Sequence, residues 1–285
     1  MIASMRGHWP EYLIEAGGLG FFMISASLFG VAIEHPASPV RAAITDPLAR
    51  RALMGAAMGL TAMAIIHSPW GKRSGAHINP AVTLTFWTLG KVKGPDALFY
   101  ALFQFAGAAA GMAVAGLLLG GTLGHPAVAF VKTVPGPGGA GAAFAAELAI
   151  SFLLMTAILT ASNAPSLMRW TGLFAGCLVA SFITFEAPLS GMSMNPARTF
   201  GSAWAASSWE AWWVYASAPV VGMLAAAFFH SALRRIPVRC AKLVHPAGGP
   251  CIFRCGFAMA PRTAPAPAGV RQGPIPRTSS ARRTS

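Results

Sequence analysis

Two stretches of this 285-residue chain, HINPAVT at residues 77–83 and MNPART at residues 194–199, repeat the same Asn-Pro-Ala pattern. In each stretch Asn precedes a Pro that suits the first position of a helix, because Pro has no N–H to satisfy and its backbone angle is helical. Both stretches lie between apolar runs that are long enough to cross a bilayer. The pattern therefore predicts two helix starts inside a membrane.

The composition predicts an all-α membrane protein. The chain is 55% hydrophobic and only 10% charged, whereas soluble domains carry about 25% charged residues. A spanning helix needs roughly 20 predominantly apolar residues. We expect six transmembrane helices, at residues 11–33, 51–67, 97–119, 142–162, 170–185 and 210–233.

Six spans place both termini on the same side of the membrane. The basic residues on that side are Arg6, Lys72, Arg73, Lys91, Lys93, Arg169 and ten more in the C-terminal tail. Those on the other side are Arg41, Arg50, Arg51 and Lys132. By the positive-inside rule both termini are cytoplasmic, and we expect a multi-pass protein of the inner or plasma membrane.

The tail, residues 234–285, differs in composition from the rest of the chain. It holds ten of the 21 basic residues, no Asp or Glu, and is rich in Pro and Ala. We expect it to be cytoplasmic and disordered, outside a membrane domain of residues 1–233. Basic residues beside a membrane helix are typical of contact with anionic lipid, so we expect no nucleic-acid partner.

The cysteines do not predict a metal site or a disulfide. Cys177 falls in an apolar run, where it acts as a small hydrophobic residue. Cys240, Cys251 and Cys255 fall in the tail, at spacings that match no short paired zinc pattern. A cytosolic tail would keep these thiols reduced. We expect no metal and no cofactor.

The two Asn-Pro-Ala stretches lie outside the six predicted spans. Residues 81–89 and 197–206 are apolar over about half a membrane thickness, and each follows a Gly-containing polar turn. Irregular backbone at membrane depth is tolerated only when it is buried in protein or lines a watery cavity. We therefore expect two re-entrant half-helices that enter from opposite faces and meet at the midplane.

The chain also contains two similar halves, at about residues 11–120 and 142–233. Glu15 and Glu147 stand at corresponding places in the first span of each half. Each half has three spans, an odd number, so the second copy is inserted upside down as an inverted repeat. Interrupted helices at matching places in inverted halves predict a shared site at the midplane.

These motifs resemble the two signature loops of the major intrinsic protein family, the aquaporins and glycerol facilitators. The resemblance rests on residues 74–83 and 191–203 and on the two in-register glutamates, and it covers about residues 11–233. It implies a channel domain of six helices and two half-helices, usually assembled as a homotetramer with one pore in each subunit. It implies no enzyme, and the sequence has no nucleophile, base and acid at matching membrane depth.

The resemblance assigns pore roles to the motif residues Asn79, Pro80, Ala81, Asn195, Pro196 and Ala197. Each half-helix would present the positive end of its dipole at the midplane. The two Asn amides would donate to a passing water molecule and interrupt a proton-conducting chain, while the positive field opposes cations.

The resemblance assigns a bracing role to three further residues. Glu15 and Glu147 would accept hydrogen bonds from backbone N–H groups that the re-entrant loops leave without helical partners. His77 would brace the first loop rather than act as a ligand or a base.

The resemblance also implies an outer selectivity filter around Arg198. An Arg near the bilayer centre is costly, about 3 kcal/mol, so we expect it to face water. Counting back from the second motif adds Met192 and Ile183, and the second span supplies either Met58 or Gly59. This set matches neither the aromatic–His pair typical of water-selective members nor the two aromatics of glycerol facilitators.

Two residues near this filter bear on its interpretation. Thr199, directly after Arg198, resembles the water branch, because glycerol facilitators usually carry Asp there. Glu186 has no counterpart in the first half, and it either pairs with Arg198 or lies in the outer vestibule.

The expected function is a passive channel for water, with glycerol, urea or ammonia as further small neutral solutes. One alternative is a secondary transporter that couples a solute to protons through Glu15, Glu147 or Glu186; strict dependence of uptake on a pH gradient would favour it. Another alternative is a non-conducting membrane scaffold, which folded tetramers that pass nothing would favour.

Overall fold

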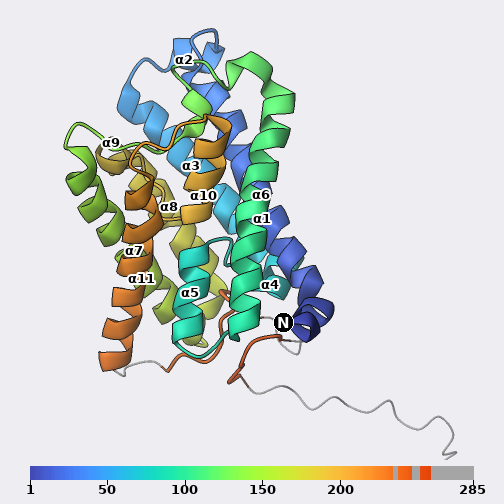
Figure 1. Ribbon diagram of the computed structural model, residues 1–285. Coiled ribbons are helices and arrows are strands. Elements are labelled where there is room, and N and C mark those ends of the chain that lie inside the picture. The colour runs from blue at the N-terminus through green and yellow to red at the C-terminus, as the bar shows by residue number, and fades with distance from the viewer. Residues whose placement is uncertain (234–236, 246–250, 258–285) are drawn as a thin grey trace, which may run out of the picture.

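The computed structural model describes residues 1–233, 237–245 and 251–257. The described residues form an all-helical bundle with no strand (Figure 1). Among them, six helices are long and apolar enough to span a membrane. These are α1 (Ile2–Glu34), α3 (Pro47–His67), α6 (Gly94–Leu119), α7 (Gly139–Asn163), α8 (Thr171–Phe185) and α11 (Trp212–Leu233). The six predicted spans are confirmed, and the largest difference is that α1 begins at Ile2 instead of residue 11.

The two predicted half-helices are also confirmed. They are α5 (Pro80–Thr88) and α10 (Pro196–Ala205), and each begins at the Pro of its motif. The preceding Asn caps each helix: Asn79 Oδ1 accepts from Ala81 N at 2.9 Å, and Asn195 Oδ1 accepts from Ala197 N at 3.0 Å. An Asn cap thus satisfies a helix N–H that has no helical partner.

Corresponding helices pack together in the two halves of the chain. Helix α1 packs on α6 in the first half and α7 on α11 in the second, while α3 on α8 joins the halves. Each half-helix also contacts a long helix of the other half, α10 on α6 and α5 on α11. The α1–α6 contact is close, because a Cβ atom at Gly107 would lie 2.2 Å from the carbonyl oxygen of Ala16.

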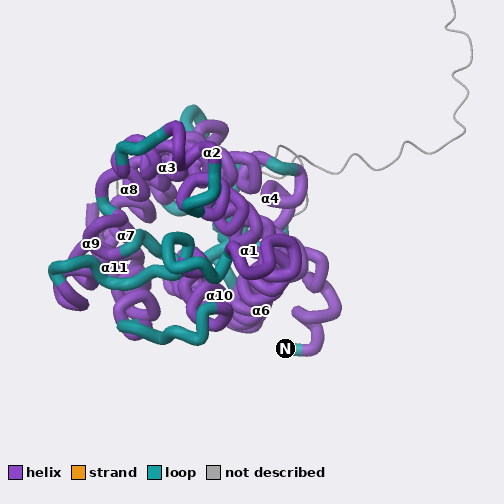
Figure 2. Tube along the Cα trace, turned by 90° about the horizontal axis from the view of Figure 1, so that it is seen from above, coloured by secondary structure: helices purple, strands orange, loops and turns teal. Residues whose placement is uncertain are grey.

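Three short helices cover the ends of the bundle: α2 (Pro39–Ala43), α4 (Pro69–Ser74) and α9 (Ala187–Ser190). Helices α4 and α9 stand at matching places, directly before the two re-entrant loops. Helices α2 and α9 lie toward one end of the bundle, which we call the outer end (Figure 1). The N-terminus lies at the opposite end, which we call the inner end. Seen from above, loops cross the middle of the surrounding helices (Figure 2).

The polar turn expected before the first motif is instead the helix α4. Ser68 caps it by accepting from Gly71 N at 2.9 Å, and Pro69 stands at its first position. The Ser-Pro pair is a helix-start signal that outweighs the Gly-rich composition of residues 71–75.

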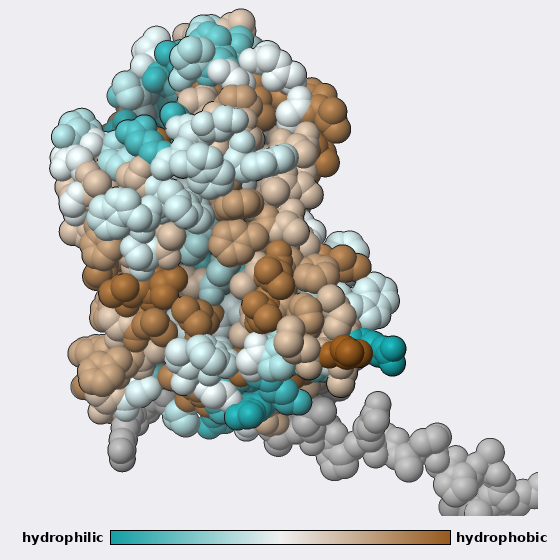
Figure 3. Space-filling view, viewed as in Figure 1, coloured by the Kyte–Doolittle hydropathy of each residue, from teal (hydrophilic) through white to brown (hydrophobic). Residues whose placement is uncertain are grey.

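The outside of the bundle carries many exposed apolar side chains. Leu117 is 86% exposed and Phe228 is 79% exposed. Apolar side chains gather in the lower middle of the face in Figure 3, between hydrophilic ends. Such exposure is typical of a membrane protein, since soluble proteins rarely leave large contiguous apolar patches uncovered.

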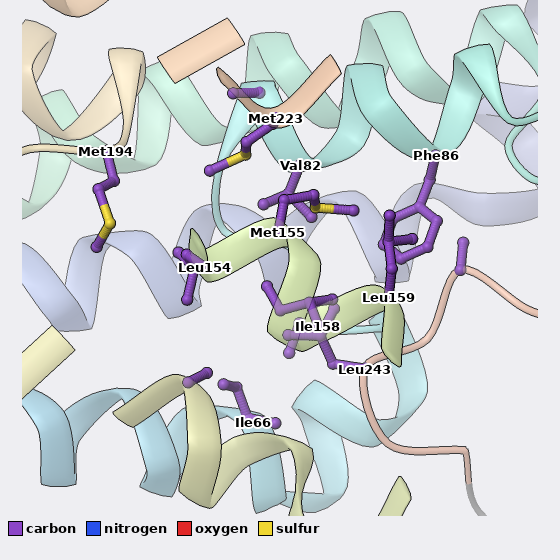
Figure 4. Packing of buried hydrophobic residues seen from close by; sticks show 14 of the residues in the cluster. Ile66, Val82, Phe86, Leu154, Met155, Ile158, Leu159, Met194, Met223 and Leu243 are labelled. Atoms are coloured by element: carbon purple, nitrogen blue, oxygen red, sulfur yellow. The ribbon is translucent and has the colours of Figure 1, made fainter. Parts of the chain in front are cut away.

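Residues 237–245 and 251–257, here called the tail segment, pack on the inner end of the bundle. Leu243 N donates to Gly75 O at 3.2 Å, and Leu243 lies in the same hydrophobic cluster as Ile158 (Figure 4). The sequence did not predict this contact. Residues 258–285 lie outside the described residues, so the division into a channel domain and a separate tail stays a prediction.

Candidate functional site

A single cavity of about 310 Å³ is lined by the motif residues of both halves. Asn79, Asn195 and Arg198 line it along its middle portion, at the starts of α5 and α10. Its lining extends to Glu34 near the outer end and to Leu243 of the tail segment at the inner end. The cavity therefore follows the axis along which the two half-helices meet.

The two motif asparagines join the re-entrant loops to each other. Asn79 Nδ2 donates to Met194 O at 2.7 Å, and Asn195 Nδ2 donates to Ile78 O at 2.7 Å. Each Asn thus uses its oxygen to cap its own half-helix and one of its two amide protons to bind the opposite loop. One N–H of each amide is left to donate into the cavity that both residues line.

Both loops adopt the same uncommon backbone. Ala76 and Ile78 have φ values of 54° and 39°, and Met192 and Met194 have values of 52° and 54°. Non-Gly residues at positive φ are uncommon and cost free energy, so the surrounding structure must hold them. The recurrence of this conformation at matching positions shows that the two loops are built alike.

Glu15 is buried and accepts four hydrogen bonds beside the first loop. Two come from the backbone, His77 N at 3.1 Å and Ile78 N at 2.5 Å. The others come from Ser74 Oγ at 2.7 Å and Gln104 Nε2 at 2.8 Å. The carboxylate thereby satisfies N–H groups that no helix can satisfy.

Glu147 makes the equivalent contacts in the second half. It accepts from Ser193 N at 2.6 Å, from Met194 N at 2.7 Å and from Ser190 Oγ at 2.8 Å. Both glutamates therefore have the geometry that the expected bracing of the loops requires.

Two tyrosines that the motifs do not indicate also hold the loops. Tyr100 Oη donates to Ser74 O at 2.6 Å, and Tyr215 Oη donates to Ser190 O at 2.5 Å. They stand in the third span of each half, about 20 residues after the motif Asn, so alignment of the two halves on their Asn-Pro-Ala motifs is the signal that could find them.

His77 connects the first loop to the tail segment. Its Nε2–H donates to Ala241 O at 2.8 Å, and its Nδ1 lies 3.0 Å from Thr83 Oγ1. The imidazole ring stacks between Phe86 and Phe253, at centroid distances of 5.2 and 5.4 Å. Both ring nitrogens are used in these contacts, which agrees with a bracing role.

The two candidates for the helix-two filter position, Met58 and Gly59, lie in different surroundings. Met58 lines the cavity together with Ile183, Met192 and Arg198. Gly59 instead packs against α8, where an added Cβ atom would lie 2.5 Å from Gly176 O. The placement therefore favours Met58, and Gly59 serves the contact between α3 and α8.

Arg198 and Glu186 do not form an ion pair in the described part of the chain. Arg198 lines the cavity, and its Nη1 has no hydrogen-bond partner among the described residues. Glu186 is 8% exposed and does not line the cavity, and burial raises its pKa to about 7. An unpaired guanidinium N–H at the cavity wall can donate to a passing solute.

Comparison with known proteins agrees with this architecture. The family model of the major intrinsic protein matches residues 6–230. Aquaporin NIP1-4 of Oryza sativa subsp. japonica is 35% identical over 215 residues, which cover 75% of this chain and 73% of the relative. The probable aquaporin AqpM of Archaeoglobus fulgidus is 38% identical over 193 residues, which cover 64% of this chain and 76% of the relative.

A solved structure supports the same fold. The X-ray structure of the aquaglyceroporin from Plasmodium falciparum superposes with a TM-score of 0.66 at 20% identity, covering 80% of this chain and 98% of that chain. At this identity the likeness concerns the fold alone. The family match, the relatives and the paired half-helices together show that this chain belongs to the major intrinsic protein family.

Proposed function

We propose that this chain is a passive transmembrane channel for water and small uncharged solutes. The observation that carries the proposal is the reciprocal pair of bonds from Asn79 to Met194 and from Asn195 to Ile78, beside one shared cavity. Two amide N–H groups and two positive helix ends meet there. A passing water molecule turns its oxygen toward them, which interrupts the chain of hydrogen bonds along which protons move, and cations are repelled.

The cavity wall around Arg198 sets the choice of solute in this proposal. Met58, Ile183 and Met192 are apolar, and Arg198 supplies the charge and the donors. Three apolar walls can contact the carbon backbone of a solute favourably, whereas polar walls would first have to give up their own bound water. We therefore expect glycerol, and to a lesser degree urea and ammonia, to pass beside water.

A proton-coupled transporter finds less support in the structure. Glu15, Glu147 and Glu186, the carboxylates that such a mechanism would use, do not line the cavity. Glu15 and Glu147 instead accept hydrogen bonds from the two re-entrant loops. A carboxylate that holds a loop in place is poorly suited to release and rebind a proton in each transport cycle.

The proposal includes a multi-pass location in the inner or plasma membrane, with cytoplasmic termini and lipid around the bundle. The exposed apolar side chains support the lipid contact, and the distribution of basic residues supports the orientation. We expect a homotetramer, as is usual for the family, in which each chain keeps its own pore.

Stopped-flow light scattering on proteoliposomes tests the choice of solute. Vesicles with and without protein are mixed with gradients of an impermeant osmolyte, glycerol, urea or ammonium chloride. We expect faster water efflux and faster glycerol entry with protein than without. Fast water efflux with glycerol entry at the rate of protein-free vesicles would limit the channel to water. No difference for any solute would contradict the proposed channel.

A further inference from the structure

Four side chains that can ligate a metal gather in the tail segment at the inner end: Cys240, His245, Cys251 and Cys255. Each offers one ligand atom, and these atoms all lie within 4.8 Å of one another. None of the four lines the pore cavity. We propose that they form a structural zinc site, which the spacing of the cysteines along the sequence did not predict.

The distances suit a tetrahedral ion. Cys240 Sγ lies 3.5 Å from Cys251 Sγ, and Cys255 Sγ lies 3.2 Å from His245 Nε2. Zinc bonds of about 2.3 Å to sulfur and about 2.0–2.1 Å to nitrogen place tetrahedral ligand atoms about 3.5–3.8 Å apart. A sulfur–sulfur distance of 3.5 Å is far longer than a disulfide bond of about 2.05 Å, and the cysteines are free.

The donor set selects the kind of metal. Three thiolates and one imidazole are ligands for zinc, whereas Mg²⁺ and Ca²⁺ prefer oxygen. Four protein ligands also fill a tetrahedral shell, so no position is left open for water or a substrate. The site is therefore suited to holding structure and not to catalysis.

The surrounding charges favour the bound form. Zinc with three thiolates carries a net charge of about −1. Arg239, Lys242 and Arg254 lie within the tail segment, which contains no Asp or Glu. Positive neighbours favour the thiolate form of cysteine, which is the form that binds a metal.

The backbone around the ligands is already held in place. Asn163 Oδ1, at the end of α7, accepts from Arg239 N at 2.6 Å and from Cys240 N at 3.3 Å. Arg254 N donates to Lys91 O at 2.9 Å, in the connection between α5 and α6. The two arms that carry the ligands, residues 237–245 and 251–257, are thus anchored at separate places on the bundle. Gly256 N donates to Arg239 O at 2.6 Å between them, and a metal would add a stronger link.

The first arm, residues 237–245, also contacts residues of the pore. Ala241 O accepts from His77 Nε2, and Leu243 lines the inner end of the cavity. A metal that joins the two arms therefore fastens a segment that contacts both the first re-entrant loop and the inner entrance.

Metal analysis of the purified full-length chain without an affinity tag tests this proposal. We expect about one zinc ion per chain in the wild type and little in Cys251→Ser or Cys255→Ser. Cys177→Ser removes an exposed cysteine outside the cluster and should retain the zinc. Cys251→His keeps a zinc ligand and should also retain it. Replacement of zinc by Co²⁺ should produce tetrahedral cobalt bands and a thiolate-to-cobalt band.

Limited proteolysis tests whether zinc holds the tail segment in place on the bundle. Trypsin can cut after Arg239, Lys242 and Arg254, and zinc removal should speed these cuts in the wild type while leaving their rates unchanged in Cys251→Ser. Equal cutting of the zinc-loaded and zinc-free wild type would contradict the fastening.

Three results would overturn the zinc site: wild-type protein that neither retains zinc nor gives tetrahedral cobalt bands, equal zinc in Cys251→Ser and the wild type, or a persistent Cys240–Cys251 disulfide by mass. Circular dichroism and gel filtration of each variant separate loss of the ligand from loss of the fold. None of these readouts depends on water permeability, so the zinc site can fail while the proposed channel stands, and the reverse.

Discussion

The side-chain amide of Asn79 donates a 2.7 Å hydrogen bond to the main-chain carbonyl of Met194, which belongs to the opposite re-entrant loop. Asn195 returns the contact to Ile78 at the same distance. The half-helices are thus joined at their N-terminal ends by the same groups that face the cavity. A change at either Asn therefore affects the junction and the pore together, although the cap on the half-helix can be kept.

Asn79→Asp keeps the helix cap and removes the amide, so it tests the junction and the pore donor together. Asp caps a helix as well as Asn does, so the bond to Ala81 N is kept. The amide donor is lost and a negative charge replaces it at the midplane. We expect the passage of cations to rise at least about tenfold, since each 1.4 kcal/mol taken from a barrier is worth that factor. Currents across planar bilayers measure this, and an unchanged cation current would contradict the role of the amide.

Arg198→Val tests the charge at the proposed filter. The guanidinium lines the cavity, so its removal lowers the barrier to protons and cations while leaving an opening for water. We expect a larger proton leak at similar water permeability. Arg169→Val is the matched control, because Arg169 is exposed outside the cavity. Equal leak in the two variants would remove Arg198 from the proposed filter.

Glu147→Ala tests the bracing of the second loop. The substitution leaves Ser193 N and Met194 N without their acceptor. Each buried unpaired donor costs about 1–3 kcal/mol, so the free energy of unfolding should fall by at least about 2 kcal/mol. Thermal unfolding in detergent measures the loss. Glu15→Ala should behave alike, and the exposed Glu210→Ala should not; three equal midpoints would contradict the bracing.

The buried carboxyl of Glu186 should make the stability of the fold depend on pH. Burial raises its pKa to about 7 from the ordinary value of 4.5, so the folded state binds the proton more tightly than the unfolded state. Its contribution to stability is full below about pH 4.5 and is lost as the pH rises to about 7. Glu186→Gln should therefore flatten the decline in the unfolding midpoint between pH 5 and pH 8. An equal decline in both proteins would exclude Glu186 as its source.

The sequence located the half-helices to within one residue, because an Asn cap followed by Pro is a local signal. Residues 81–89 were expected and α5 spans Pro80–Thr88; residues 197–206 were expected and α10 spans Pro196–Ala205. The choice between Met58 and Gly59 was not local. It depended on the rotation of α3 against α8, which the contact of Gly59 with Gly176 sets.

The tail segment could not be predicted from its own composition. Residues rich in Pro, Arg and Ala do not form a core by themselves, but Leu243 and Phe253 pack on surfaces that the bundle supplies. Likewise, Cys240 and Cys255 are farther apart in the sequence than the cysteines of a short zinc motif. They come together because the bundle holds each of the two arms in place. Both features depend on tertiary contacts between distant parts of the chain.

In the proposed channel one cavity passes water while the paired half-helices exclude protons. The most direct test measures osmotic water efflux and proton flux on the same preparation of proteoliposomes, with protein-free vesicles as the baseline. We expect water efflux well above the baseline and proton flux equal to it. Water efflux at the baseline, or proton flux that rises in proportion to the water flux, would contradict it.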